Sequence, residues 1–276
     1  MQIQINLPTR KLKPSLDKIV QRVLEIRKEG IDLAKKTFNF KNFDFNNPFH
    51  EAAAINEVED QILSKQEDNA LYIGTIKAKK DLSNKFVTIN FFLTPTVSHD
   101  STSGAAYLQH LEVHITARTL FKEYEEILAL LFHEIKHFLQ INRTSQEYQT
   151  VISTLKKITK NTDKDELAQT FSLYHTDIAE FETTLTELIT TMYYKFLRLR
   201  KSSGNNWRQV RKEILDGLQN IISNNVKHAI EHIPSVFPRH TKQFFTSIHL
   251  SRQPDIYWSH VQEHLSNLYK RLSNTW

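Results

Sequence analysis

The sequence contains no cysteine, which excludes disulfide bonds, thiolate metal ligands and a cysteine nucleophile together. Any metal site must therefore consist of histidine and carboxylate side chains. Glycine and proline are scarce, at 5 and 7 of 276 residues, which excludes collagen-like and low-complexity chains and favours helices. The longest apolar run, Ile127–Phe132, is too short to span a bilayer. The N-terminal residues lack the apolar core of a signal peptide, so we expect a cytoplasmic protein with no membrane segment.

Positive charge is concentrated in the last third of the chain. The formal net charge is +5, and residues 195–276 carry 13 basic and 5 acidic side chains. This segment also contains aromatic residues, so it could contact nucleic acid or another polyanion through phosphate contacts and stacking. Solvated helix faces with buried aromatic side chains are the alternative explanation of the same composition.

Hydrophobic periodicity changes along the chain. Two amphipathic helices are expected before residue 70, the first opening at Pro14 and closing at Gly30, the second beginning at Asn47. Runs rich in β-branched and aromatic residues then predict three strands of one small antiparallel sheet, at Leu71–Lys77, Phe86–Leu93 and Tyr107–Ile115.

From Thr116 onwards the apolar residues follow a helical period. The expected helices cover residues 120–139, 148–158, 166–174, 178–199, 207–222, 226–233 and 256–272. The sequence thus predicts a mainly helical α+β protein in which a small antiparallel sheet precedes these helices. We expect an N-terminal helical region at 1–70, a central core at 71–203 and a basic helical region at 204–276 packed on that core.

One helix of the central region carries the motif His133-Glu134-Ile135-Lys136-His137. Histidines four residues apart project from the same helical face one turn apart, which suits two ligands of one tetrahedral Zn²⁺. Glu134 then contacts the metal-bound water as the general base, and can pass the proton to a leaving amine. An apolar run leads directly into His133, and polar groups in a core helix are costly unless a partner satisfies them.

Two reversed copies of this motif compete for the metal. They are His228-Ala229-Ile230-Glu231-His232 and His260-Val261-Gln262-Glu263-His264, which match the inverted zinc-peptidase pattern. Each has little downstream sequence that could supply a Glu ligand, so surface or capping histidines are the alternative. A di-iron helical bundle would need a second Glu-x-x-His besides Glu134 and His137, and the sequence has none.

The histidine motif is followed, 43 residues beyond His137, by Ala179-Glu180-Phe181-Glu182 on the next long helix. This arrangement resembles the gluzincin zinc metallopeptidases, and among them the compact zincin-like domains of bacteria and phages. The resemblance covers about residues 71–200 and includes the order of parts: a small sheet, the helix with the histidine pair, and a Glu-bearing helix. It implies a hydrolase that holds one zinc ion per chain and cleaves a peptide or protein substrate. A phage-encoded protein of this kind would act in the host cell.

Carried over to this sequence, the resemblance implies Glu134 as the general base and His133, His137 and Glu180 as the zinc ligands. Helical periodicity alone favours Glu182 over Glu180, because Glu182 borders the apolar stripe of its helix. A helix that is covered on two sides would be compatible with Glu180 as the ligand.

Other contributions to the site stay open at this stage. Many gluzincins have Asp or a small residue four positions after the ligand Glu to support a ligand histidine, whereas this chain has Thr184. The candidates for stabilising a developing oxyanion, a task these enzymes usually assign to Tyr or His, are Tyr174, His175, Tyr193 and Tyr194.

Two further expectations concern substrate and function. An extended peptide could lie along Tyr107–Ile115 if that strand forms an edge of the sheet, and a central, fully paired strand is the equal alternative. The alternative function is a non-catalytic, zincin-like binding module in which the metal is absent or structural. In that case the basic segment at 195–276 would engage nucleic acid or a protein partner.

Overall fold

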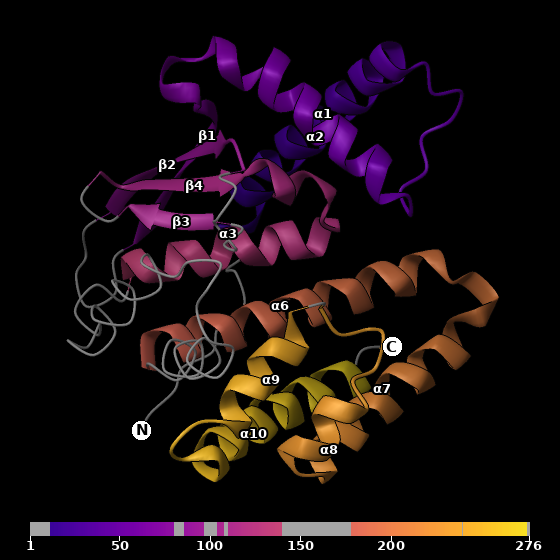
Figure 1. Ribbon diagram of the computed structural model, residues 1–276. Helices are drawn as coiled ribbons and strands as arrows, with labels where there is room; N and C mark the ends of the chain where they lie inside the picture. The colour runs from indigo at the N-terminus through magenta and orange to yellow at the C-terminus, as the bar shows by residue number, and fades with distance from the viewer. Residues whose placement is uncertain are drawn as a thin grey trace. The chain divides into compact units, whose positions relative to one another are not determined.

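The computed structural model describes residues 12–79, 86–96, 104–107, 110–139, 178–238 and 240–274. These residues form helices and one small sheet, so the expected mainly helical α+β class is confirmed (Figure 1). The chain divides into two compact units, Pro8–Leu139 and, among the described residues, 178–274. The helices expected at 148–158 and 166–174 lie outside the described residues.

The first unit begins with two helices, α1 (Lys13–Phe38) and α2 (Pro48–Gln61). Proline lies in the first turn of both helices, where its missing N–H has no helical partner to lose. Asn47 caps α2 by accepting a hydrogen bond from the Phe49 N–H at 3.0 Å. Both expected helix starts are therefore confirmed.

The expected end of the first helix at Gly30 is wrong. α1 continues past Gly30 and ends at Asn39, which adopts the left-handed conformation with φ 55°. A Cβ atom added to Gly30 would lie 2.5 Å from Val58 Cγ2 and 2.9 Å from the Ala54 carbonyl oxygen. The glycine is therefore explained by the close approach of α1 to α2, since any side chain at this position would separate the two helices.

Four strands form one sheet in the order β1-β2-β4-β3. They are β1 (Leu71–Lys79), β2 (Phe86–Thr94), β3 (Gly104–Tyr107) and β4 (Glu112–Thr116). β1 pairs antiparallel with β2, and β3 with β4, but β2 and β4 run parallel. The expectation of an antiparallel sheet is therefore wrong for the central pair. The chain passes from β2 to the edge strand β3 and returns through β4 beside β2, an order in space that side-chain alternation does not encode.

The expectation of a single strand at Tyr107–Ile115 is wrong, because Tyr107 ends β3 and β4 begins only at Glu112. Leu111 has φ 55° and lies in the turn before β4, so the chain reverses between β3 and β4. β4 is hydrogen-bonded to β2 on one side and to β3 on the other. Docking of a peptide along Tyr107–Ile115 as one edge strand is therefore excluded, and the edges of the described sheet are β1 and β3.

One face of the sheet forms the core of the first unit. α1 contacts β1, while α3 (Tyr124–Leu139) contacts β3 and β4. The side chains buried on this face alternate along the strands and include Ile76, Ile89, Phe91, Val113 and Ile115. α3 begins later than the expected residue 120, because Ala117–Phe121 form a short 3-10 turn before it. The sheet thus supports the helix that carries the histidine motif.

The second unit consists of helices around its own core. They are α6 (Ile178–Ser202), α7 (Trp207–Ser223), α8 (Val226–Glu231), α9 (Thr241–His249) and α10 (Pro254–Ser273). The apolar stripe of α6 packs against α7, α9 and α10 through side chains that include Phe181, Leu185, Phe196, Leu218, Phe244, Phe245 and Leu265. α9 was not expected, because its apolar residues are few and its flanks resemble a loop. None of the described helices is long and apolar enough to cross a membrane.

Candidate metal centre

α3 places the histidine pair on one helical face. At the start of the helix, the Glu123 N–H donates a hydrogen bond to Glu126 Oε2 at 3.1 Å, which satisfies one of the free N–H groups of the first turn. Buried apolar residues from Ile127 to Phe132 then hold α3 in the core. His133 and His137 follow one turn apart, so the local spacing of the motif produces the expected geometry.

The two imidazoles face each other at a distance that suits a shared ion. Their Nε2 atoms are 3.1 Å apart, and the ring planes meet at 68° with centroids 5.0 Å apart. Two nitrogen ligands at about 2.0–2.1 Å from a tetrahedral Zn²⁺ would be roughly 3.3 Å apart. The separation of the two Nε2 atoms is therefore close to that of two histidine ligands of one ion.

The electrostatic environment keeps His137 in the form that binds metals. Burial, then the neighbouring His133, then Lys136 lower the pKa of His137 well below its usual value of 6.5. The imidazole is therefore neutral at neutral pH and retains a lone pair for a ligand bond. Protons compete less well for this nitrogen than for a histidine in water.

Glu134 lies next to His133 on α3 and is buried. Its neighbours His133 and His137 supply nitrogen atoms, and Glu134 is not part of the group of ligand atoms that the structure brings together. A carboxylate that lies beside two metal ligands without binding the ion itself can act as a proton acceptor. The expected role of Glu134 as general base stays a prediction.

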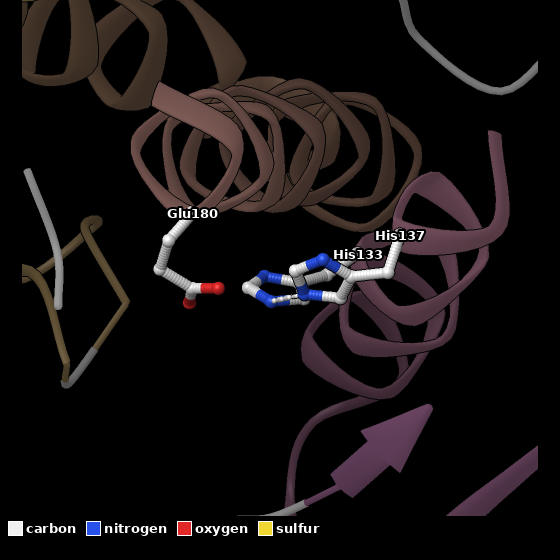
Figure 2. A group of neighbouring side chains, drawn as sticks. All are labelled: His133, His137 and Glu180. Carbon is white, nitrogen blue, oxygen red and sulfur yellow. Dashed lines mark hydrogen bonds between the residues drawn. The ribbon is translucent and has the colours of Figure 1, made fainter. Parts of the chain in front are cut away.

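Glu180, in the first turn of α6, contributes the carboxylate of the group. One ligand atom from each of His133, His137 and Glu180 lies within 4.8 Å of the other two, and the carboxylate points toward the imidazoles (Figure 2). A His-His-Glu group of this kind could hold a metal ion.

The Glu180 side chain is oriented by its own helix. The Thr184 hydroxyl, one turn further along, donates a hydrogen bond to Glu180 Oε1 at 3.3 Å, and Thr183 Oγ1 donates to the Glu180 carbonyl oxygen at 2.9 Å. Thr184 thus contacts the Glu180 carboxylate itself, whereas the resemblance suggested that this position supports a histidine. The four-residue spacing of Glu180 and Thr184 is visible in the sequence, but the spacing alone does not say which side chain Thr184 contacts.

Glu182 does not join the group, although it is as buried as Glu180. Helical periodicity favours Glu182 only if a single face of its helix is covered. α6 is instead buried at every position from Glu180 to Met192, so the border of its apolar stripe does not decide which carboxylate meets a ligand. Glu180 and Glu182 project about 200° apart on a helix, so only one of them can serve.

Two of the four residues expected to stabilise an oxyanion, Tyr193 and Tyr194, do not lie with the ligand group. Tyr193 and Tyr194 lie on α6, and 13 residues separate Tyr193 from Glu180, which is about 20 Å along the helix axis. Tyr193 instead accepts a hydrogen bond from Arg271 at 3.3 Å. Tyr174 and His175 lie outside the described residues.

The reversed motifs have a different geometry. The rings of His228 and His232 stack at 4.2 Å with an interplanar angle of 17°, and His260 Nδ1 lies 3.9 Å from Glu263 Oε2. Neither copy belongs to a group of three metal-ligating side chains within the described part of the chain. α8 ends at Glu231, so His232, the second histidine of the first copy, lies just beyond the helix. The chain then continues into a loop that contains Pro234.

One polar pair was not foreseen. Glu187 lies two turns beyond Glu180 on the same face of α6, is buried, and places Oε1 3.8 Å from Nε2 of His240. His240 directly precedes α9, the helix that the sequence did not predict. The two residues are far apart in the sequence, so only the packing of α9 on α6 brings them together.

Comparison with known proteins adds no assignment: no family model, no curated protein and no solved structure matches the chain. The fold and the His-His-Glu group are therefore the observations from which a function must be inferred. Both are independent of the family resemblance that the sequence motifs suggested.

Proposed function

We propose that this protein is a zinc-dependent metallopeptidase of the gluzincin type. The observation that carries the proposal is the pair of Nε2 atoms 3.1 Å apart on one helix, with the buried Glu134 beside it and the Glu180 carboxylate close by. Two imidazoles and one carboxylate leave the fourth tetrahedral position open, which is typical of catalytic rather than structural zinc sites.

Zinc is the metal that best fits these donors. Two neutral imidazoles and one carboxylate form a common zinc set, and the chain has no cysteine that would complete a closed four-ligand site. The lowered pKa of His137 keeps its nitrogen available at neutral pH. We expect one zinc ion per chain, held by His133, His137 and Glu180.

In the proposed reaction Glu134 transfers protons, while Thr184 orients the Glu180 carboxylate. When bound, zinc supplies Lewis acidity that polarises the scissile carbonyl and acidifies a water. Glu134 takes the proton of the attacking water and delivers it to the leaving amine nitrogen, so one carboxylate acts first as base and then as acid. The Thr184 hydroxyl keeps the Glu180 carboxylate oriented through the cycle.

The alternative is a binding module with a structural metal or none, acting through the basic segment at 195–276 on nucleic acid or a protein. The two functions differ in what Glu134 does. A catalyst requires this carboxylate although it binds no metal, whereas a structural site does not.

The test is Glu134→Gln, with zinc content measured by elemental analysis and hydrolysis measured on a mixed library of quenched fluorescent peptides. We expect one zinc per chain to be retained and hydrolysis to fall at least about a hundredfold, because general acid–base catalysis supplies factors of that order. Glu125→Gln is the matched control, since Glu125 is buried on the same helix outside the ligand group and should keep its activity.

Two results would overturn the proposal. Undiminished cleavage in Glu134→Gln would show that another base, or no zincin chemistry, is at work. Absence of zinc after reconstitution of the wild-type protein would remove the metal centre itself.

A further inference from the structure

The C-terminal ends of α6 and α10 and the beginning of α7 together carry a dense set of cations. Residues 188–212 contain seven Lys and Arg residues and no Asp or Glu, and residues 264–276 add Lys270 and Arg271, again without an acidic residue. We define the cationic surface by its exposed members, which are Arg198, Arg200, Lys201, Arg208, Lys212, Lys270 and Arg271.

Contacts within the second unit bring these cations to one place. Arg211 of α7 donates to the Ser273 carbonyl oxygen at the end of α10, at 2.6 Å. Arg271 of α10 lies 4.3 Å from the centroid of the Tyr193 ring on α6 and donates to its hydroxyl. Phe196 and Trp207 pack at 4.9 Å across the α6–α7 connection. The three helix ends that carry the exposed cations therefore lie close together.

Helix electrostatics explains only part of this concentration of charge. Lys and Arg in the last turns of α6 and α10 interact favourably with the negative ends of the helix dipoles. Arg208 lies instead in the first turn of α7, followed by Lys212 one turn later, and that turn contains no acidic residue. Cations at a helix N-terminus add to the positive end of the dipole and cost stability. An anionic partner would offset this cost.

The composition of the surface selects among anionic partners. The exposed large hydrophobic side chains of the described residues are Phe38, Phe45, Phe49, Tyr72, Phe86, Leu250 and Ile256, and none lies on the three helix ends that form the cationic surface. A bilayer would need an apolar group to insert, and a protein partner would need an apolar anchor. A phosphate backbone needs neither, because its affinity comes from Lys and Arg contacts and counterion release.

We propose that the cationic surface binds the phosphate backbone of nucleic acid without regard to sequence. Guanidinium groups, which predominate among its exposed cations, suit phosphate because they donate in a planar fork. The inference does not depend on the metal centre, since every residue of the cationic surface lies outside the ligand group. Such a surface would bring the enzyme, or the binding module, to nucleic acid.

The test measures binding of a fluorescent 20-base-pair DNA duplex by anisotropy at several salt concentrations. The variant Arg200→Gln/Lys201→Gln/Arg208→Gln/Lys212→Gln should bind at least about tenfold more weakly at low salt. Its slope of log affinity against log salt should be shallower by up to about 3.6, because each of the four lost phosphate contacts contributes about 0.9.

A charge-matched control removes four exposed cations from the first unit, in Lys18→Gln/Lys28→Gln/Lys36→Gln/Lys41→Gln. This control and Glu134→Gln should both bind DNA like the wild-type protein. Circular dichroism and zinc content establish that each variant is folded.

Three results would overturn the proposal. They are absence of duplex binding by the wild-type protein at 50 mM salt, an equal loss in the two fourfold variants, and tighter binding to phosphatidylserine vesicles than to the duplex. The second result would mean that net charge alone is responsible, and the third that the partner is a lipid surface.

Discussion

At the scale of single residues, Glu180 and Glu182 provide an internal comparison. Both are buried on α6 two positions apart, but only Glu180 lies with the histidine pair. We predict that Glu180→Gln weakens zinc binding at least about tenfold, which is the smallest loss seen even for residues that only support a ligand. Glu182→Gln should leave zinc affinity within about twofold of the wild type. Competition with a chromophoric chelator measures both.

A greater loss in Glu182→Gln than in Glu180→Gln would reverse the assignment. It would also mean that the periodicity of α6 was the better guide. Thr184→Val should weaken zinc binding less than Glu180→Gln, because it removes only the hydroxyl that orients the carboxylate.

His137 couples the stability of the metal-free protein to pH. Burial, then His133 and Lys136, hold its pKa well below 6.5 in the folded state, whereas the unfolded chain protonates this side chain near 6.5. As pH falls below about 6.5, the unfolded state binds more protons than the folded state. The free energy of unfolding therefore becomes smaller as pH falls, until pH reaches the pKa of His137 in the folded state. The contribution of His137 is thus complete above that range and is lost in acid.

Urea unfolding of chelator-treated protein between about pH 7.5 and 5 measures this effect. His137→Gln should show a smaller loss of stability across the range than the wild type. An unchanged pH profile in His137→Gln would show that another group is responsible.

At the scale of elements, the packing of α1 on α2 depends on Gly30. An added Cβ would meet Val58 Cγ2 at 2.5 Å and the Ala54 carbonyl oxygen at 2.9 Å. Overpacking costs about 1–3 kcal/mol, and the better helix propensity of alanine returns up to about 1 kcal/mol. We therefore predict that Gly30→Ala lowers the free energy of unfolding by about 1–2 kcal/mol, measured by urea denaturation.

The double variant Gly30→Ala/Val58→Ala tests the cause. Removing Cγ2 relieves one of the two close contacts, so the double variant should lose less stability than the sum of the single variants. Strict additivity would mean that the contact with Val58 does not limit this helix pair.

A helix or strand was predictable from the sequence where residues within the same segment determine where it begins or which face it presents. Pro14 and Asn47 predicted the starts of α1 and α2. The spacing of His133 and His137 predicted that both rings lie on one face of α3. Gly30 was misinterpreted because a glycine that permits close packing and one that ends a helix look alike in sequence. The turn at Leu111 was missed because leucine rarely adopts a positive φ, so nothing in the sequence divided Tyr107–Ile115.

At the scale of the whole molecule, what could not be predicted is the pairing of segments distant in sequence. The parallel pairing of β2 with β4 depends on strand order, and the meeting of Glu187 with His240 depends on how α9 packs. The convergence of cations likewise needed the contacts of Arg211 and Arg271, since composition showed only that residues 195–276 are basic. Glu180 was suggested by resemblance, while local periodicity favoured Glu182.

Metal binding should be visible in the stability of the entire protein. A ligand that binds only the folded state raises the free energy of unfolding by about 2.7 kcal/mol at a hundredfold excess over its Kd. We therefore predict that zinc raises the Tm of chelator-treated protein, measured by scanning fluorimetry at constant ionic strength, and that magnesium does not, because imidazole ligands suit zinc. Glu134→Gln should keep the full shift, since Glu134 is not in the ligand group, whereas His133→Ala/His137→Ala should lose it. An equal zinc shift in that double variant would place the ion elsewhere, and the stacked His228–His232 pair would be the first site to test.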